Sequence, residues 1–139
     1  MEQALYQASI STFEDLGLMF PIENADGSAS MDGECSSVGV RFHGSFSGEI
    51  VLEVEDQILP AIASNMLGED GPVEPQMMQD ALGEMANVIC GNALPAIAGK
   101  TEVFRLESPV SVERRLVAAT AKAHLLFDEG KANVYIYVD

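Results

Sequence analysis

Cationic residues and cysteines are both scarce in this chain. Lysine and arginine together number 7 against 22 aspartates and glutamates, so the formal net charge is -15 at pH 7. Because this charge repels a phosphate backbone and an anionic bilayer, we expect no nucleic acid or membrane partner. The two cysteines, Cys35 and Cys90, form no CxxC pair and have no histidine at ligand spacing. Neither a disulfide framework nor a metal site is therefore expected.

Long apolar runs are also missing. No apolar stretch reaches the roughly 18 residues that a membrane span needs. The residues after Met1 lack the basic patch and apolar run of a signal peptide, so we expect a cytoplasmic protein. At 139 residues, 47% hydrophobic and 21% charged, the chain has the composition of a folded protein rather than a disordered one. One domain over residues 1–139 is the simplest organisation.

Hydrophobic periodicity predicts both helices and strands. Apolar residues recur at helical spacing over 2–18 and from Pro75 to at least Gly91. A shorter helix is expected from an Asp56 N-cap to a stop at Gly68. Alternating apolar and polar residues predict a hairpin over 37–55, and small polar residues predict a loop over 24–30.

Three further strands are predicted in the last third of the chain. They lie at 103–106, 120–127 and 134–138, and the last two are joined by a turn at 128–131. Together these elements predict the α+β class, with a mostly antiparallel β-sheet packed against helices.

The long helix carries a polar stripe, made of Asp80, Glu84, Asn87 and Gly91. At about 100° per residue these four positions fall within a sector of about 40°, opposite the apolar Met78, Leu82, Met85 and Ile89. On spacing alone this is the solvated face of an amphipathic helix. However, an asparagine and two glycines are poor choices inside a helix. We therefore expect the stripe to contact a partner, with Gly83 and Gly91 allowing close approach to the helix backbone.

Asp80-x-x-x-Glu84-x-x-Asn87, followed by Gly91-Asn92-Ala93 and later by Ser108-Pro109-Val110, resembles the active-site helix of CheX-type chemotaxis phosphatases. These proteins belong to the CheC/CheX/FliY superfamily, and the predicted order of elements resembles theirs over nearly the whole chain. The resemblance implies a CheC-like or CheX-like fold and a homodimer, formed through sheet edges. It also implies a phosphatase of the two-component signalling class that acts on a phosphorylated CheY-like response regulator.

The resemblance assigns the catalytic roles to Glu84 and Asn87. It implies that Glu84 forms a salt bridge with the lysine of the receiver's active site and that the Asn87 amide orients the attacking water. Asp80 is expected to support them, with Gly83 and Gly91 at the partner contact. An acyl phosphate has a good leaving group and the receiver supplies its own Mg²⁺, so no metal or cofactor of this chain is expected.

Other functions of the same residues stay open at this point. The opening helix has Glu14 but no asparagine three residues later, so one E-x-x-N site is expected, as in CheX. The stripe could equally serve a non-catalytic module that docks on a receiver or a flagellar-switch component. A small-ligand sensory domain would need a sizeable apolar pocket. His43 and His124 are interpreted as ordinary strand residues, and no G-x-S-x-G nucleophile motif occurs.

Overall fold

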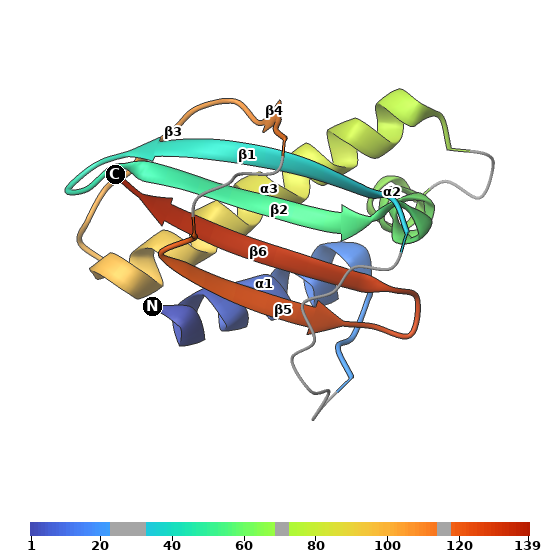
Figure 1. Cartoon of the computed structure of the whole chain (residues 1–139), viewed down its shortest axis with the longest axis horizontal. Coiled ribbons are helices and arrows are strands. Elements are labelled where there is room, and N and C mark those ends of the chain that lie inside the picture. The colour runs from blue at the N-terminus through green and yellow to red at the C-terminus, as the bar shows by residue number, and fades with distance from the viewer. Residues whose placement is uncertain (23–32, 69–72, 114–117) are drawn as a thin grey trace.

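The molecule consists of one sheet layer and one helix layer (Figure 1). The computed structural model describes residues 1–22, 33–68, 73–113 and 118–139, so the expected loop at 24–30 lies outside the described residues. The elements in chain order are α1 (Glu2–Gly17), β1 (Cys35–His43), β2 (Gly48–Glu55), α2 (Leu59–Leu67), α3 (Pro75–Ala98), β3 (Arg105–Leu106), β4 (Val110–Ser111), β5 (Ala121–Leu126) and β6 (Lys131–Val138).

The sheet has six strands, and all its pairings are antiparallel. Neighbouring strands follow the order β3-β1-β2-β6-β5, while β4 also pairs with β1. The predicted hairpin is the β1/β2 pair, in which Val40 lies opposite Ile50 and both are fully buried. The predicted α+β class and the antiparallel sheet are therefore confirmed.

Helices α1 and α3 cover one face of this sheet, which we call the inner face (Figure 1). Leu5 and Phe13 of α1 and Leu82, Met85 and Ile89 of α3 are completely buried there. Burying a side chain of this size contributes roughly 1.5–3 kcal/mol, so this apolar layer fixes the rotation of α3 about its axis. The rotation of α3 in turn decides where its polar residues lie.

Two details of the helices differ from the sequence-based expectation. Asp56 does not cap α2, because it lies in a 3-10 turn and its carboxylate accepts a hydrogen bond from the Ser36 hydroxyl at 2.6 Å. Helix α2 begins three residues later and ends as predicted at Gly68, which adopts a left-handed conformation with φ of 68°. Helix α3 continues past Gly91 and through Pro95 to Ala98.

The continuation of α3 through Pro95 has a local explanation. A proline in a helix removes one hydrogen bond and brings its ring against the carbonyl four residues earlier. Here that earlier residue is the exposed Gly91, while the neighbouring Ala93 and Leu94 are buried in the core. The burial of these side chains offsets the cost of the proline.

The observed bounds of the strands in the last third of the chain differ from the predicted ones. Strand β3 covers only Arg105–Leu106 because Val103 is 84% exposed, whereas β6 starts at Lys131, three residues earlier than predicted. The turn before β6 is confirmed by the hydrogen bond from the Phe127 amide to the Gly130 carbonyl. Strand β4 was not predicted, and it lies beside the site described next.

Candidate functional site

The polar stripe lies on the side of α3 that faces away from the core. Asp80, Glu84 and Gly91 are exposed and Asn87 is half-buried. Pro75 starts the helix, in a position where the missing amide hydrogen costs nothing. Because an α-helix rises 1.5 Å per residue, Glu84 and Asn87 are separated by about 4.5 Å along the axis. The two side chains therefore lie within reach of a single partner surface.

The hydrogen bonds of the stripe differ along its length. Asp80 accepts a bond from the Gln76 side-chain amide at 2.9 Å, one helical turn earlier. Among the described residues, neither the Glu84 carboxylate nor the Asn87 amide has a hydrogen-bonding or ionic partner. Asn87 is thus a half-buried amide whose hydrogen-bonding groups are not used by the part of the chain that the structure describes.

The stripe borders a groove of about 330 Å³ between α3 and β4, which we call the α3/β4 groove. One wall is the helix, and the other is the segment around β4, which lies along the edge of the sheet beyond β1 (Figure 1). The groove is lined by Val38, Gln76, Gln79, Asp80, Gly83, Glu84, Asn87, Pro109 and Ser111. Two carboxylates thus share it with neutral amide and hydroxyl groups.

The two glycines Gly83 and Gly91 of α3 have different surroundings. A Cβ atom at Gly83 would lie 3.3 Å from Cβ of Pro109, so this glycine makes room for the chain's own β4 segment. Gly83 also lines the α3/β4 groove, so the expected contact of a partner at this residue stays a prediction. At Gly91, by contrast, an added Cβ would meet nothing within 4 Å. Only this glycine leaves the backbone of the stripe open.

Sequence reasoning missed the second wall of the groove. Ser111 and Val38 line it because β4 pairs with β1, with Val38 opposite Ser111. A two-residue strand has no periodicity that a sequence could show. The one residue of this wall that the sequence pointed to was Pro109, which belongs to the Ser108-Pro109-Val110 motif of the family resemblance.

The two histidines and the buried Cys90 lie outside the α3/β4 groove. His43 lies 2.5 Å from the Glu107 carboxylate, and His124 lies 2.5 Å from the Asn133 side-chain oxygen. Burial raises the pKa of the Cys90 thiol to about 12, which keeps it protonated. In the described ranges, no three His, Cys, Asp or Glu side chains are grouped so that they could hold a metal ion. Nor does any helix in those ranges have the length and apolar composition needed to cross a membrane.

The arrangement favours positioning chemistry over covalent catalysis. The residues that line the groove include no cysteine and no histidine, and its one serine, Ser111, therefore has no imidazole base beside it there. The Asn87 amide can both donate and accept a hydrogen bond, and the carboxylates attract a cation. Such a site can orient a water molecule against a reactive group that a partner brings.

Comparison with known proteins assigns the chain to a family. The sequence profile described as "Chemotaxis phosphatase CheX" matches residues 36–127, which is more than half of the chain and includes the polar stripe. This chain belongs to the CheX family. The resemblance at Glu84-x-x-Asn87 implied a phosphatase that acts on CheY-like response regulators. This is the activity of the CheX family. No curated protein sequence matches the chain significantly.

Solved CheX structures share its fold. CheX from Desulfovibrio desulfuricans superposes with a TM-score of 0.75 at 20% identity, and the match covers 99% of this chain and 97% of that chain. CheX from Vibrio vulnificus gives 0.71 at 18% identity, with 99% and 95% covered. CheX from Borrelia burgdorferi, solved as a complex with CheY, BeF3 and Mg²⁺, gives 0.66 at 22% identity, with 98% and 96% covered. The predicted CheX-like fold is thus confirmed.

Proposed function

We propose that Glu84 and Asn87 carry out the hydrolysis of the aspartyl phosphate on a CheY-like response regulator. The observation that supports this assignment best is the position of Asn87, which is half-buried beside the α3/β4 groove without a hydrogen-bonding partner in the described residues. The exposed Glu84 lies one turn before it. The CheX of B. burgdorferi was solved with CheY, which supports a receiver domain as the partner.

Asn87 is proposed to orient the attacking water. Its amide oxygen accepts a hydrogen bond from the water and its NH₂ group donates one to a phosphoryl oxygen, which places the water in line with the scissile bond. The water oxygen forms a new bond to phosphorus while the bond to the aspartate oxygen breaks. The products are the free aspartate carboxylate and inorganic phosphate, which takes up both protons of the water as H₂PO₄⁻ and then equilibrates with the solvent. The receiver's own Mg²⁺ is proposed to neutralise the phosphoryl charge.

Glu84 is proposed to anchor the receiver through its active-site lysine. An ion pair at this point orients the partner so that the phosphoryl group lies over Asn87. Asp80, held by Gln76, adds negative charge one turn earlier and supports the same contact. Gly91 is proposed to allow the partner to approach the helix, because a Cβ atom added there would meet nothing within 4 Å.

The test is phosphate release from a purified, Mg²⁺-bound, phosphorylated CheY-like receiver. Asn87→Ala is expected to lower the rate at saturating receiver roughly 10²-fold, because it removes the group that positions the water. Glu84→Ala is expected mainly to raise KM. Gln7→Ala and Glu102→Ala remove an exposed amide and an exposed carboxylate elsewhere and serve as controls. Activity at the wild-type level in both Glu84→Ala and Asn87→Ala would refute the assignment.

The same assay separates catalysis from docking. If the stripe only docks on a receiver or a flagellar-switch component, Asn87→Ala changes affinity and turnover in step. If Asn87 positions water, turnover at saturation falls while affinity, measured by titration with a BeF₃-activated receiver, changes little. The unpartnered amide beside the groove favours the second outcome.

We further propose a cytoplasmic homodimer that joins through the β5 edge of the sheet. Edge strands present backbone groups that can pair with a second chain. The opposite edge, formed by β3 and β4, borders the α3/β4 groove and is needed for the receiver. Sedimentation equilibrium is expected to give twice the chain mass, and a single-chain mass at all concentrations would refute the dimer.

A further inference from the structure

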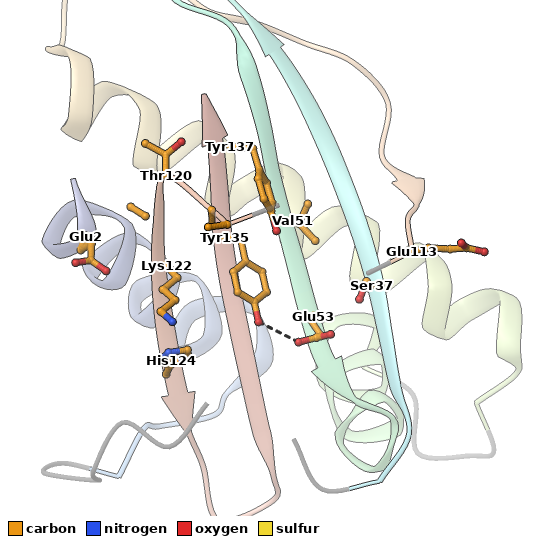
Figure 2. A pocket seen from close by; sticks show the side chains of 13 residues that line it. Glu2, Ser37, Val51, Glu53, Glu113, Thr120, Lys122, His124, Tyr135 and Tyr137 are labelled. Carbon is orange, nitrogen blue, oxygen red and sulfur yellow. Dashed lines mark hydrogen bonds between the residues drawn. The ribbon is translucent and has the colours of Figure 1, made fainter. Parts of the chain in front are cut away.

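A second concave site lies on the outer face of the sheet, opposite the helices. Its volume is about 410 Å³, within the range of roughly 300–1,000 Å³ that small-molecule sites occupy. Figure 2 shows its main side chains: Lys122 and His124 on β5, Tyr135 and Tyr137 on β6, and Glu53 on β2. None of these residues belongs to the proposed phosphatase site. We call it the outer-face pocket.

Charged groups of both signs line this pocket. Lys122 lies on the β5 side, where Glu2 of α1 also lines the pocket, and Glu53 lies on the β2 side with Glu113 beyond it (Figure 2). Because β6 runs between β5 and β2 and neighbouring strands are about 4.8 Å apart, the two backbones are separated by about 10 Å. Among the described residues no ion pair joins Lys122 to any carboxylate. The fold thus keeps a cation and an anion apart across two tyrosine rings.

A hydrogen-bonded row fixes the acidic side. His124, Asn133 and Glu53 are direct cross-strand neighbours on β5, β6 and β2. The Asn133 amide, only 2% exposed, donates to Oε1 of Glu53 at 3.3 Å, and its oxygen lies 2.5 Å from Nδ1 of His124. The Tyr135 hydroxyl donates to the same Glu53 oxygen at 3.3 Å (Figure 2).

This row has a consequence for what can bind. Because the amide NH₂ faces the carboxylate, the amide oxygen faces His124, which therefore carries its proton on Nδ1. Both bonds to Glu53 use one carboxylate oxygen, and no hydrogen bond within the described residues uses the other. The carboxylate is thus held in one orientation with an acceptor to spare. A bound ammonium group would find a preorganised partner there.

We propose that the outer-face pocket binds a small zwitterion of the amino-acid class. Its ammonium group would pair with Glu53, its carboxylate with Lys122, and its side chain would lie over the tyrosine rings. A singly charged ligand would satisfy only one side of the pocket and leave the other charge without a partner. The inference does not depend on the phosphatase assignment, because the two sites share no residue and lie on different faces of the sheet.

The test compares three probes that differ only in charge: L-phenylalanine, 3-phenylpropanoate and 2-phenylethylammonium. Binding is followed by amide chemical shifts in β5 and β6 and by tyrosine emission, since the chain has no tryptophan and three tyrosines, two of which line the pocket. L-phenylalanine is expected to bind about tenfold more tightly than either analogue, the effect of one additional charged hydrogen bond.

Two variants identify the groups involved. Lys122→Met is expected to reduce the affinity for L-phenylalanine to that for the amine, and Glu53→Gln to reduce it to that for the acid. Lys100→Met and Glu102→Gln, both at exposed positions outside the pocket, are matched controls without effect. Lys122 is exposed, so its replacement tests the proposal even if Glu53→Gln fails to fold. Equal affinity for all probes, unchanged affinity in Lys122→Met, or shifts that map to the α3/β4 groove would overturn the proposal.

Discussion

Gly91→Ala is predicted to stabilise the fold and to weaken the phosphatase. Gly91 lies inside α3, and an added Cβ would meet nothing within 4 Å. Alanine is favoured over glycine in a helix interior by about 1 kcal/mol, and no steric term offsets this gain. For a chain of this length, about 1 kcal/mol raises the thermal midpoint by roughly 3 °C.

Two other glycines calibrate the stability part of this prediction. At Gly83 the same helix gain is opposed by contact with Pro109, whose Cβ and Cγ would lie 3.3 and 3.4 Å from the new atom. We expect a smaller rise for Gly83→Ala, or none. At Gly48 the new Cβ would overlap the Tyr137 backbone carbonyl in the β2/β6 ladder. Gly48→Ala is expected to destabilise by roughly 3 kcal/mol, as overpacking does.

The activity part uses the same Gly91→Ala protein. If the receiver approaches α3 at this point, the extra methyl group raises KM for the phosphorylated receiver although the fold is more stable. The assays are thermal unfolding followed by circular dichroism and phosphate release at several receiver concentrations. A lower thermal midpoint for Gly91→Ala would refute the helix argument, and a higher midpoint with unchanged KM would remove Gly91 from the proposed interface.

Two further predictions concern titratable groups. The hydrogen bond with His43 lowers the pKa of Glu107. Desolvation opposes this shift, and the charges of His43, Arg41 and Arg105 add to it. A carboxyl group with a lowered pKa stabilises the folded state at pH values above its ordinary pKa of 4.5, and this stabilisation is lost as the pH falls through the pKa of the folded state. The wild-type protein is therefore expected to lose more stability than Glu107→Gln on acidification below pH 4.5, as measured by urea unfolding. Parallel losses in the two proteins would contradict this. Burial raises the pKa of Cys90 to about 12, so this thiol is expected to resist a thiol reagent at pH 8 while the half-buried Cys35 reacts. Equal reaction rates of the two thiols would show instead that the core opens readily.

Elements with strong periodicity were the ones that the sequence predicted well. The α1 helix, the β1/β2 hairpin and α3 carry apolar side chains at regular spacing, and burial of those side chains determines their structure. The opposite outcome at Asp56 has a clear cause, because its carboxylate bonds to Ser36, twenty residues away. A residue that can cap a helix does so only when no tertiary partner takes its oxygen.

The site was predictable on its helix and not across the groove. Asp80, Glu84, Asn87 and Gly91 share one side of α3 as a direct result of helical geometry. Whether a glycine on that helix is open or covered depends on a segment about 25 residues later, and Pro109 covers Gly83 while Gly91 stays open. The catalytic roles of Glu84 and Asn87 stay predictions, which the phosphate-release assay tests.

The interleaving of core and stripe on α3 restricts how such a chain can change in length. Leu82 and Met85 are completely buried, and Glu84 lies between them in the sequence on the opposite side of the helix. One residue inserted between Glu84 and Asn87 would turn everything after it by about 100°, carrying Ile89 out of the core and Asn87 away from Glu84. Folding and activity would fail together. Insertions and deletions among relatives are therefore expected to avoid this segment and to accumulate in the connections between elements.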